Sequence, residues 1–235
     1  MKLICITWIC LLVNVLYLSC SPEPISYSNT KDFEKAITLP KPTHEGTASV
    51  EEAISRRKSV RQYSSRAITT EEISQILWSA QGTGVDGTTG ATRAAPSAGA
   101  TYPVEVFVVT GEPGEDEEIP AGIYHFDPKN HALLPVVKGD KRDALSQAAL
   151  GQGFVAQAPV SIVLTVEYKR TTNRYGERGH RYVHMEIGHI TQNIHLQAVA
   201  LGLDSVAVGA FDDKNVTAIL STTYEPLMII PIGHR

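Results

Sequence analysis

The stretch RRKSVR places four cations, Arg56, Arg57, Lys58 and Arg61, around Ser59. Positive charges this close repel one another unless an anion joins them. A phosphate group would supply the missing negative charge, and the Ser59 hydroxyl would donate a further hydrogen bond to it. The same run is also compatible with a solvated basic surface that binds nothing. Taken alone, this segment leaves both interpretations open.

Three other segments have residue types suited to holding a flat ligand. Pro96, Ser97, Ala98 and Gly99 form a run of small residues in a long loop, where the backbone can approach a ring closely. An ordinary turn would look the same. The other two segments each follow a predicted strand, namely Gly209 with Ala210, and the C-terminal Arg235.

Taken in order, these four segments resemble the nitroreductase family, and within it the SagB-type branch, over residues 49–235. Five further stretches match the same pattern: QILWSAQ (75–81), GIYHFDP (122–128), YGERGHRY (175–182), EIGHITQN (186–193) and ALGL (200–203). No single stretch is decisive, but the ordered set is very improbable by chance.

The resemblance implies an α+β fold in which helices sandwich a mainly antiparallel sheet. It implies an intertwined homodimer with a long helix at its centre and a non-covalently bound FMN at the subunit interface. It also implies electron transfer in two half-reactions, in which a reduced donor such as NAD(P)H leaves before a small organic acceptor binds. The chemistry belongs to the flavin, so the resemblance identifies no catalytic side chain.

The matching motif positions imply roles for the cationic segment. Arg57 and Ser59 are expected to meet the phosphate and ribityl chain of FMN, with Lys58 in the same group. Arg61 is expected near the pyrimidine end of the flavin, where a cation stabilises the anionic reduced form. Arg235 is expected to help hold the phosphate.

The remaining motif positions imply contacts with the ring system. The small-residue loop is expected to reach the isoalloxazine from the other subunit, through Pro96, Ser97, Ala98 and Gly99. Gly209 and Ala210 are expected to face the flavin near N5 with their backbone.

Three other functions remain open on the sequence. The chain could bind flavin without turnover, or it could oxidise azoline rings in a modified peptide, as SagB-type proteins do. A transition metal held by His180, His184 and His195 is the third possibility, because helical spacing brings these imidazoles toward one face.

The N-terminus has the features of an export signal. One lysine precedes an apolar run that ends at Cys20, and the end of the run resembles a lipoprotein cleavage site. We therefore expect a signal over residues 1–20, a Pro/Ser/Thr-rich tether over 21–46 and a cofactor-binding domain over 47–235. The domain is expected outside the cytoplasm, and it would meet the membrane only through the leader or a lipid on Cys20.

The overall composition narrows the partners. The net charge is -4, which gives no reason to expect nucleic acid. All three cysteines lie in the first twenty residues, so the expected domain has no thiolate or disulfide.

The elements that must position these segments follow from capping signals and periodicity. Capping boxes at Ser49 and Thr69 predict helices at about 49–58 and from 69 to Gly82. Apolar runs and helical patterns predict strands at 104–110, 122–127, 160–166, 205–208 and 226–232, and helices at 140–150, 181–201 and 212–220. Because the strands and helices do not alternate regularly, we expect an α+β fold.

Overall fold

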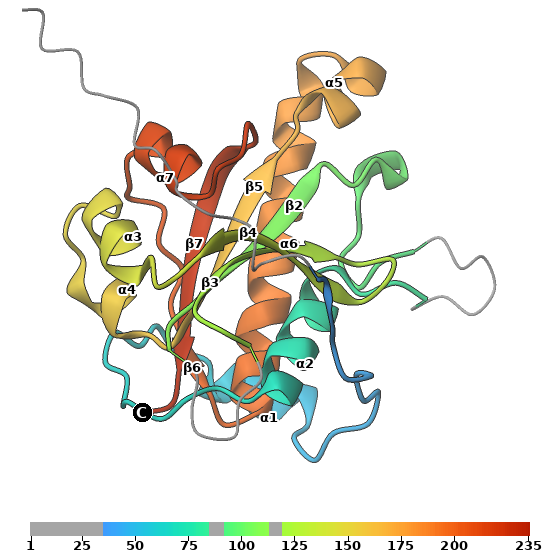
Figure 1. The fold of residues 1–235 in the computed structure, drawn as a ribbon. Coiled ribbons are helices and arrows are strands. Elements are labelled where there is room, and N and C mark those ends of the chain that lie inside the picture. Colours follow the sequence, from blue (N-terminus) through green and yellow to red (C-terminus); the bar gives the residue numbers. More distant parts are fainter. Residues whose placement is uncertain (1–34, 85–91, 113–118) are drawn as a thin grey trace, which may run out of the picture.

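The computed structural model describes residues 35–84, 92–112 and 119–235 of the chain. In this part of the chain a seven-stranded sheet has the order β1-β4-β3-β2-β5-β7-β6 (Figure 1), and each paired neighbour is antiparallel. The expected α+β fold with a mainly antiparallel sheet is thus confirmed. The strands are β1 (Ile37–Thr38), β2 (Val104–Thr110), β3 (Gly122–Asp127), β4 (Ala132–Lys138), β5 (Val160–Val166), β6 (Asp204–Ser205) and β7 (Glu225–Gly233).

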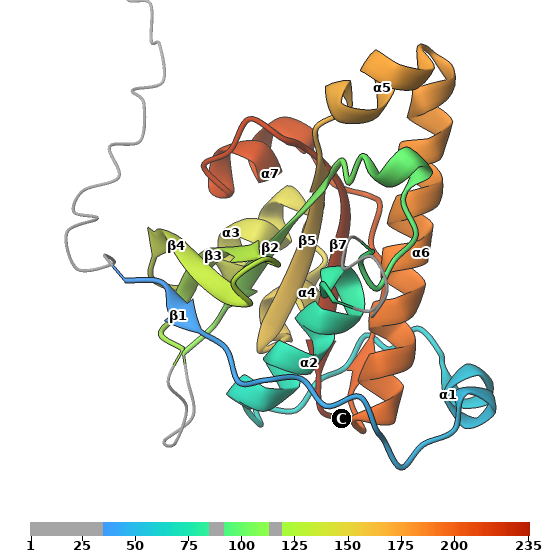
Figure 2. The same ribbon diagram turned by 90° about the vertical axis from the view of Figure 1, so that its right-hand side faces the viewer.

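Helices cover both faces of the sheet (Figure 2). Successive side chains of a strand point to opposite faces, so Val106 and Val108 of β2 join one buried cluster and Phe107 and Val109 join another. The first cluster packs against α2 (Thr70–Gln81) and α6 (Arg178–Ala200), and the second against α3 (Arg142–Ala148), α4 (Gly153–Gln157) and α7 (Asp213–Ile219). The central strands therefore read as continuous apolar runs, because both of their faces are buried.

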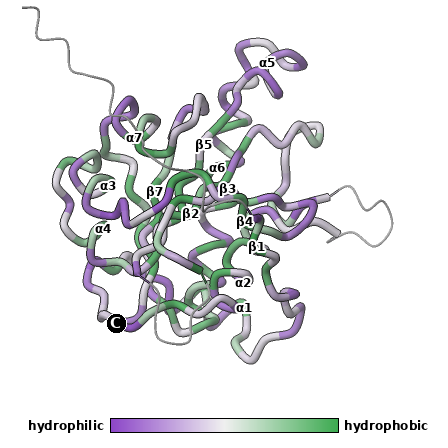
Figure 3. The backbone as a smooth tube through the Cα atoms, in the orientation of Figure 1, coloured by the Kyte–Doolittle hydropathy of each residue, from purple (hydrophilic) through white to green (hydrophobic). Residues whose placement is uncertain are grey.

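The long helix α6 carries the buried stripe that its sequence predicts. Its members recur at helical spacing and are all at most 4% exposed: Val183, Ile187, Ile190, Ile194 and Ala198. The helix begins at Arg178, ahead of the predicted start at 181, directly after the short helix α5 (Lys169–Tyr175). Figure 3 shows the contrast between the hydrophobic strands and the hydrophilic α5.

Capping explains where three of the helices begin. Thr69 and Glu72 form the predicted reciprocal capping box of α2, and Asp212 caps α7 by accepting from the Asn215 backbone. The Ser49 side chain accepts from the Glu52 backbone and starts α1 (Val50–Arg56). This helix ends at Arg56, before the predicted Lys58, because Arg57 leaves the helical region with φ -57° and ψ 123°.

Several elements escaped the sequence interpretation. The strand β4 contains Pro135, which lies opposite Tyr124 at an irregular register of the β3–β4 pair. Proline lacks the N–H that a regular ladder needs, so the pattern does not indicate a strand. The helices α4 and α5 and the strand β1 were also not predicted.

The start of the domain lies earlier than residue 47. Ile37 and Thr38 pair with β4, and Leu39 is only 4% exposed. The last part of the expected tether therefore belongs to the domain. The expected leader over residues 1–20, Cys20, and the tether up to residue 34 lie outside the described residues. None of the helices within the described ranges is long and apolar enough to cross a membrane.

Candidate functional site

The cationic segment lies beside β6 in extended backbone. The Val60 N–H donates to the Ser205 carbonyl oxygen at 3.1 Å, and Ser59 forms a parallel bridge with Ser205. Lys58 and Ser59 are exposed and Arg57 is half-buried. The early end of α1 thus leaves the functional groups of this segment accessible to a ligand.

A buried histidine contacts Ser205, the residue that bridges Ser59 of this segment. His195 of α6 is 5% exposed, and its Nδ1 lies 2.7 Å from the Ser205 hydroxyl. Burial and, as the smaller cause, the nearby positive charge of Arg57 together lower the pKa of His195 to about 4. His195 is therefore neutral at pH 7 and adds no charge to the cationic segment.

The start of α4 contacts both Arg61 and Ala210. The Arg61 guanidinium lies 5.8 Å from the centre of the Phe154 ring, and the Gln152 amide donates to the Ala210 carbonyl oxygen at 3.0 Å. Arg61, Gly209 and Ala210 are all exposed. Arg61 and Ala210 thus contact two residues that are only two positions apart, Phe154 and Gln152.

Arg235 also lies at the β6 edge of the sheet, but it already forms an ion pair. Its Nε lies 3.3 Å from a carboxylate oxygen of Asp204, the first residue of β6. In the part of the chain that the structure describes, Arg57, Lys58 and Arg61 form no such ion pair. An arriving anion would therefore find three cations whose charge is not already neutralised.

The small-residue loop lies elsewhere. Ser97 precedes a short turn, Ala98–Ala100, that contacts the first part of α6, whereas the cationic segment lies near the last part (Figures 1 and 2). A helix of 23 residues is about 35 Å long. Within one chain, the structure does not bring the loop and the cationic segment together.

A buried carboxyl group lies beneath the small-residue loop. Glu186 of α6 is 2% exposed, and burial raises its pKa to about 7, against the opposing effects of the Ser97 hydroxyl, the Arg93 charge and the Gln81 side chain. Among the described residues, its Oε1 has no hydrogen-bond partner. Glu186 can therefore hold or release a proton near neutral pH, directly below Ser97.

The helix α5 holds the same loop from outside. The Thr101 and Thr171 hydroxyls lie 2.8 Å apart, and Arg170 donates to the Tyr102 carbonyl oxygen at 3.0 Å. Arg174 donates to the Gly99 carbonyl oxygen at 3.1 Å. These hydrogen bonds fix the position of the loop relative to α5.

Several residues that contact the predicted site segments were not predicted from the sequence. Nothing in the local pattern around Gln152, Phe154 or Arg174 points to a loop far away in sequence. Asn193, the last residue of the matching stretch 186–193, donates to the carbonyl oxygens of Ser79 and Ala94 and so holds the base of the loop.

The three histidines of the metal hypothesis do not converge. The rings of His180 and His184 pack against Tyr168, while His195 bonds to Ser205. Over the described ranges, no group of three or more His, Cys, Asp or Glu side chains is placed to hold a metal ion.

A groove of about 640 Å³ opens between residues 43–50, α2 and α6. Its walls include Trp78, Asn193 and Leu196, but none of the predicted cofactor residues. This hollow is therefore separate from the predicted cofactor contacts.

The model of the nitroreductase family matches residues 54–234, which cover most of the chain. A Methanocaldococcus jannaschii protein named as a nitroreductase is 41% identical over 186 residues, 79% of this chain and 91% of its own length. The chain belongs to the nitroreductase family.

Two other proteins place this membership in context. A structure from Ralstonia eutropha, also described as a nitroreductase, superposes with a TM-score of 0.73 at 26% identity, covering 86% of this chain and 90% of the other. The microcin B17-processing protein McbC of Escherichia coli is 28% identical over 142 residues, 58% of this chain and 52% of its own length. The family and these neighbours make the chain a nitroreductase-family oxidoreductase.

Proposed function

We propose that this protein is an FMN-dependent oxidoreductase that passes electrons from a reduced donor, such as NAD(P)H, to a small organic acceptor in two separate half-reactions. The observation that carries the proposal is the accessible cationic segment beside the Gly209–Ala210 backbone. Both features lie along the β6 edge of the sheet, where Ser59 bridges Ser205 and Val208 bridges Ile229 of β7.

The residues of the cationic segment beside β6 fit the chemistry of FMN. Arg57, Lys58 and Ser59 offer charge and a hydroxyl to a phosphate, and no described carboxylate forms an ion pair with either cation. Arg61 offers a cation to the pyrimidine end, where negative charge develops on reduction. When bound, FMN would supply the two-electron chemistry, and the protein would bind it, orient it and exclude competing reactions.

We further propose a homodimer in which Pro96, Ser97, Ala98 and Gly99 of one subunit reach the cofactor of the other. Two observations support it. The loop and the cationic segment are separated along α6, so one chain does not complete the site. Val50 and Ile54 of α1 and Met185 of α6 are each more than half exposed, as apolar residues at an interface would be in an isolated subunit. Sedimentation equilibrium should give twice the subunit mass.

The cofactor proposal is tested with the full-length protein, extracted in detergent, loaded with excess FMN and desalted. We expect flavin absorbance of about one equivalent per subunit. An Arg57→Ala, Ser59→Ala double variant should lose most of it. Arg56→Ala is the matched control, because the Arg56 guanidinium is paired with Glu52 at 2.7 Å. A colourless wild-type protein would contradict the FMN proposal.

Turnover separates this function from flavin binding alone. A holoprotein that oxidises NADPH and reduces an acceptor faster than free FMN supports the oxidoreductase proposal. Bound flavin without such an increase would instead support a binding protein.

A second candidate function is azoline oxidation in a modified peptide. The similarity to a microcin-processing protein favours it, and the SagB-type resemblance points the same way. Incubating the holoprotein with an azoline-containing peptide tests it, because oxidation to the azole lowers the peptide mass by two hydrogens.

We propose, on the sequence of residues 1–20, that the chain is exported and that Cys20 is lipidated. Metabolic labelling with a radioactive fatty acid tests this proposal. A Cys20→Ser variant should lose the label, and retention of the label would contradict lipidation at this residue.

A further inference from the structure

The outer face of α5 and the first turns of α6 carry a continuous set of alternating cations and rings. The Arg174 guanidinium lies 5.4 Å from the centre of the Tyr175 ring, and the Arg178 guanidinium lies 6.0 Å from the centre of the Tyr182 ring. The two rings meet edge to face with centres 5.1 Å apart. We call these four residues, Arg174, Tyr175, Arg178 and Tyr182, the Arg–Tyr cluster.

The cluster is accessible and carries uncompensated charge. Both arginines are exposed and both tyrosines are half-buried. Glu177 lies between the two helices, yet within the described ranges neither arginine forms an ion pair. A surface of this kind attracts anions and offers ring faces and edges for stacking.

The position of the cluster gives it a relation to the candidate site. Arg174 donates to the Gly99 carbonyl oxygen, and a Cβ atom on Gly99 would overlap the Tyr175 hydroxyl. Gly99 belongs to the loop that, under the proposed function, packs on the flavin of the second subunit. The cluster would then lie beside that flavin, on helices that project from the body of the subunit (Figure 1).

We propose that the Arg–Tyr cluster is a reactant subsite that selects aromatic anions, with Arg178 bonding the anionic group and Tyr182 stacking on the ring. Such a reactant has two sources, an aromatic acceptor that carries a carboxylate, or the reduced dinucleotide donor with its phosphates. This inference rests on the proposed function and adds a substrate class to it.

The experiment uses the FMN-loaded full-length protein and separates the two half-reactions. For the oxidative half, dithionite reduces the flavin, and reoxidation is followed with 4-nitrobenzoate or with neutral 4-nitrobenzyl alcohol. For the reductive half, flavin bleaching by NADPH is followed in stopped flow. Arg178→Gln and Tyr182→Leu are the variants. Arg181→Gln is the matched control, because Arg181 is an exposed cation of the same helix outside the cluster.

We expect Arg178→Gln to lower the second-order rate constant for 4-nitrobenzoate or for NADPH by about fivefold, the size of a partly exposed charge interaction. The rate constant for the neutral acceptor and the bound flavin content should stay within about twofold of wild type. Tyr182→Leu should lower the rate constants for the anionic and neutral aromatic acceptors together. A loss with 4-nitrobenzoate assigns the subsite to acceptors, and a loss with NADPH assigns it to the donor.

Equilibrium dialysis of 4-nitrobenzoate and of oxidised NADP against wild type and Arg178→Gln gives a readout that needs no turnover. Equal binding to both proteins, together with unchanged rate constants for both anions, would overturn the subsite. A wild-type protein that binds no flavin would instead contradict the proposed function, and dialysis would still decide whether the cluster binds aromatic anions.

Discussion

The Nη1 atom of Arg174 lies 3.1 Å from the carbonyl oxygen of Gly99, which joins α5 to the small-residue loop. Gly99 has φ +60°, a left-handed conformation that side chains with a Cβ rarely adopt. The loop therefore depends on glycine twice, once for its backbone conformation and once for the space that Tyr175 and Arg174 occupy.

Replacing Gly99 by alanine should destabilise the protein and weaken flavin retention. The backbone conformation alone costs about 1–2 kcal/mol, and the new methyl group must also displace the Tyr175 side chain. The control is Gly139→Ala, because Gly139 has φ +84° but open space around it. Thermal unfolding should show a larger loss for Gly99→Ala, and flavin titration should show a loss for that variant alone. Equal losses in both assays would contradict the need for open space at Gly99.

Strong local signals made much of the fold predictable from the sequence. Thr69 and Glu72 fixed the start of α2, and the spacing of Val183, Ile187 and Ile190 indicated the long helix before any contact was known. The same holds for β2 and β5, whose apolar runs are buried on both faces. Where a local signal conflicted with the tertiary structure, as at Pro135 in β4, the prediction failed.

The site was predictable only as separate segments. The cationic run and the small-residue loop could be named from the sequence, but their separation along α6 depends on how the sheet and the helix pack. His195 was considered as a metal ligand and Glu186 begins one of the matching stretches, yet their environments depend on Ser205 and Ser97, which are distant in the chain. No local pattern predicts that a particular carboxyl group or imidazole will be buried.

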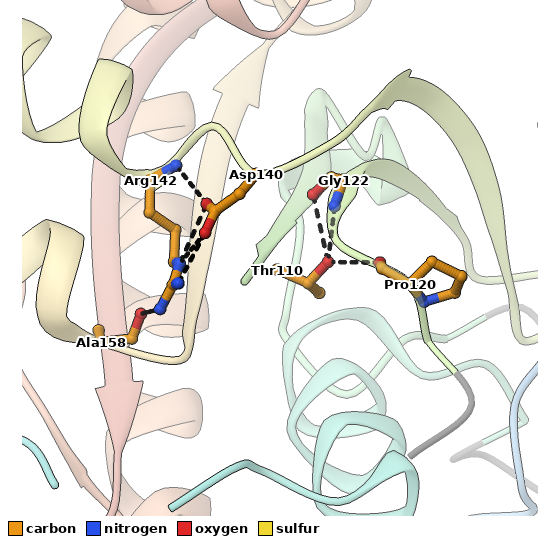
Figure 4. A network of polar contacts seen from close by, with 6 residues as sticks. All are labelled: Thr110, Pro120, Gly122, Asp140, Arg142 and Ala158. Atoms are coloured by element: carbon orange, nitrogen blue, oxygen red, sulfur yellow. Dashed lines mark hydrogen bonds and ion pairs between the residues drawn. The ribbon is translucent and has the colours of Figure 1, made fainter. Parts of the chain in front are cut away.

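A buried threonine ties β2 to the segment before β3 (Figure 4). The Thr110 hydroxyl donates to the Pro120 carbonyl oxygen at 2.9 Å and accepts from the Gly122 N–H at 3.0 Å. Thr110→Val should lower the free energy of unfolding by about 1–3 kcal/mol, because the buried Gly122 N–H loses this bond, whereas the Pro120 carbonyl oxygen still accepts from the Tyr124 hydroxyl. Denaturant titration measures this loss.

Thr165→Val provides the comparison for Thr110→Val. Its hydroxyl is equally buried but makes one longer bond, to the Glu105 carbonyl oxygen at 3.3 Å. The smaller loss is therefore expected for Thr165→Val. The reverse order would show that the Thr110 bonds contribute little.

Acid should destabilise the protein through His195. The folded-state pKa is about 4 and the ordinary value is 6.5, so between these values the unfolded state binds more protons and stability falls as the pH falls. The full effect is on the order of 3 kcal/mol. His195→Gln should remove this contribution and leave the opposing one of Glu186, so denaturant unfolding from pH 4 to 7 should show a stability that falls as the pH rises. His180→Gln, which changes an exposed histidine of the same helix, should keep the wild-type profile.

Glu186 should change the folding stability in the opposite direction over an overlapping range of pH. Burial raises its folded-state pKa to about 7 from 4.5, so the folded state binds more protons between these values and stability falls as the pH rises. In the wild type the two effects should largely cancel between about pH 4.5 and 6.5.

Glu186→Gln should therefore expose the His195 effect. We expect its stability to rise with pH up to about 6.5, and to exceed that of the wild type at pH 8 by up to about 3 kcal/mol, because no buried carboxylate must ionise. The exposed Glu71 provides the control, since Glu71→Gln should keep the flat wild-type profile. If Glu186→Gln were less stable than wild type at pH 8, the ionised carboxylate would instead be stabilised by Arg93 and Ser97, and Glu186 would serve the loop as a charged anchor.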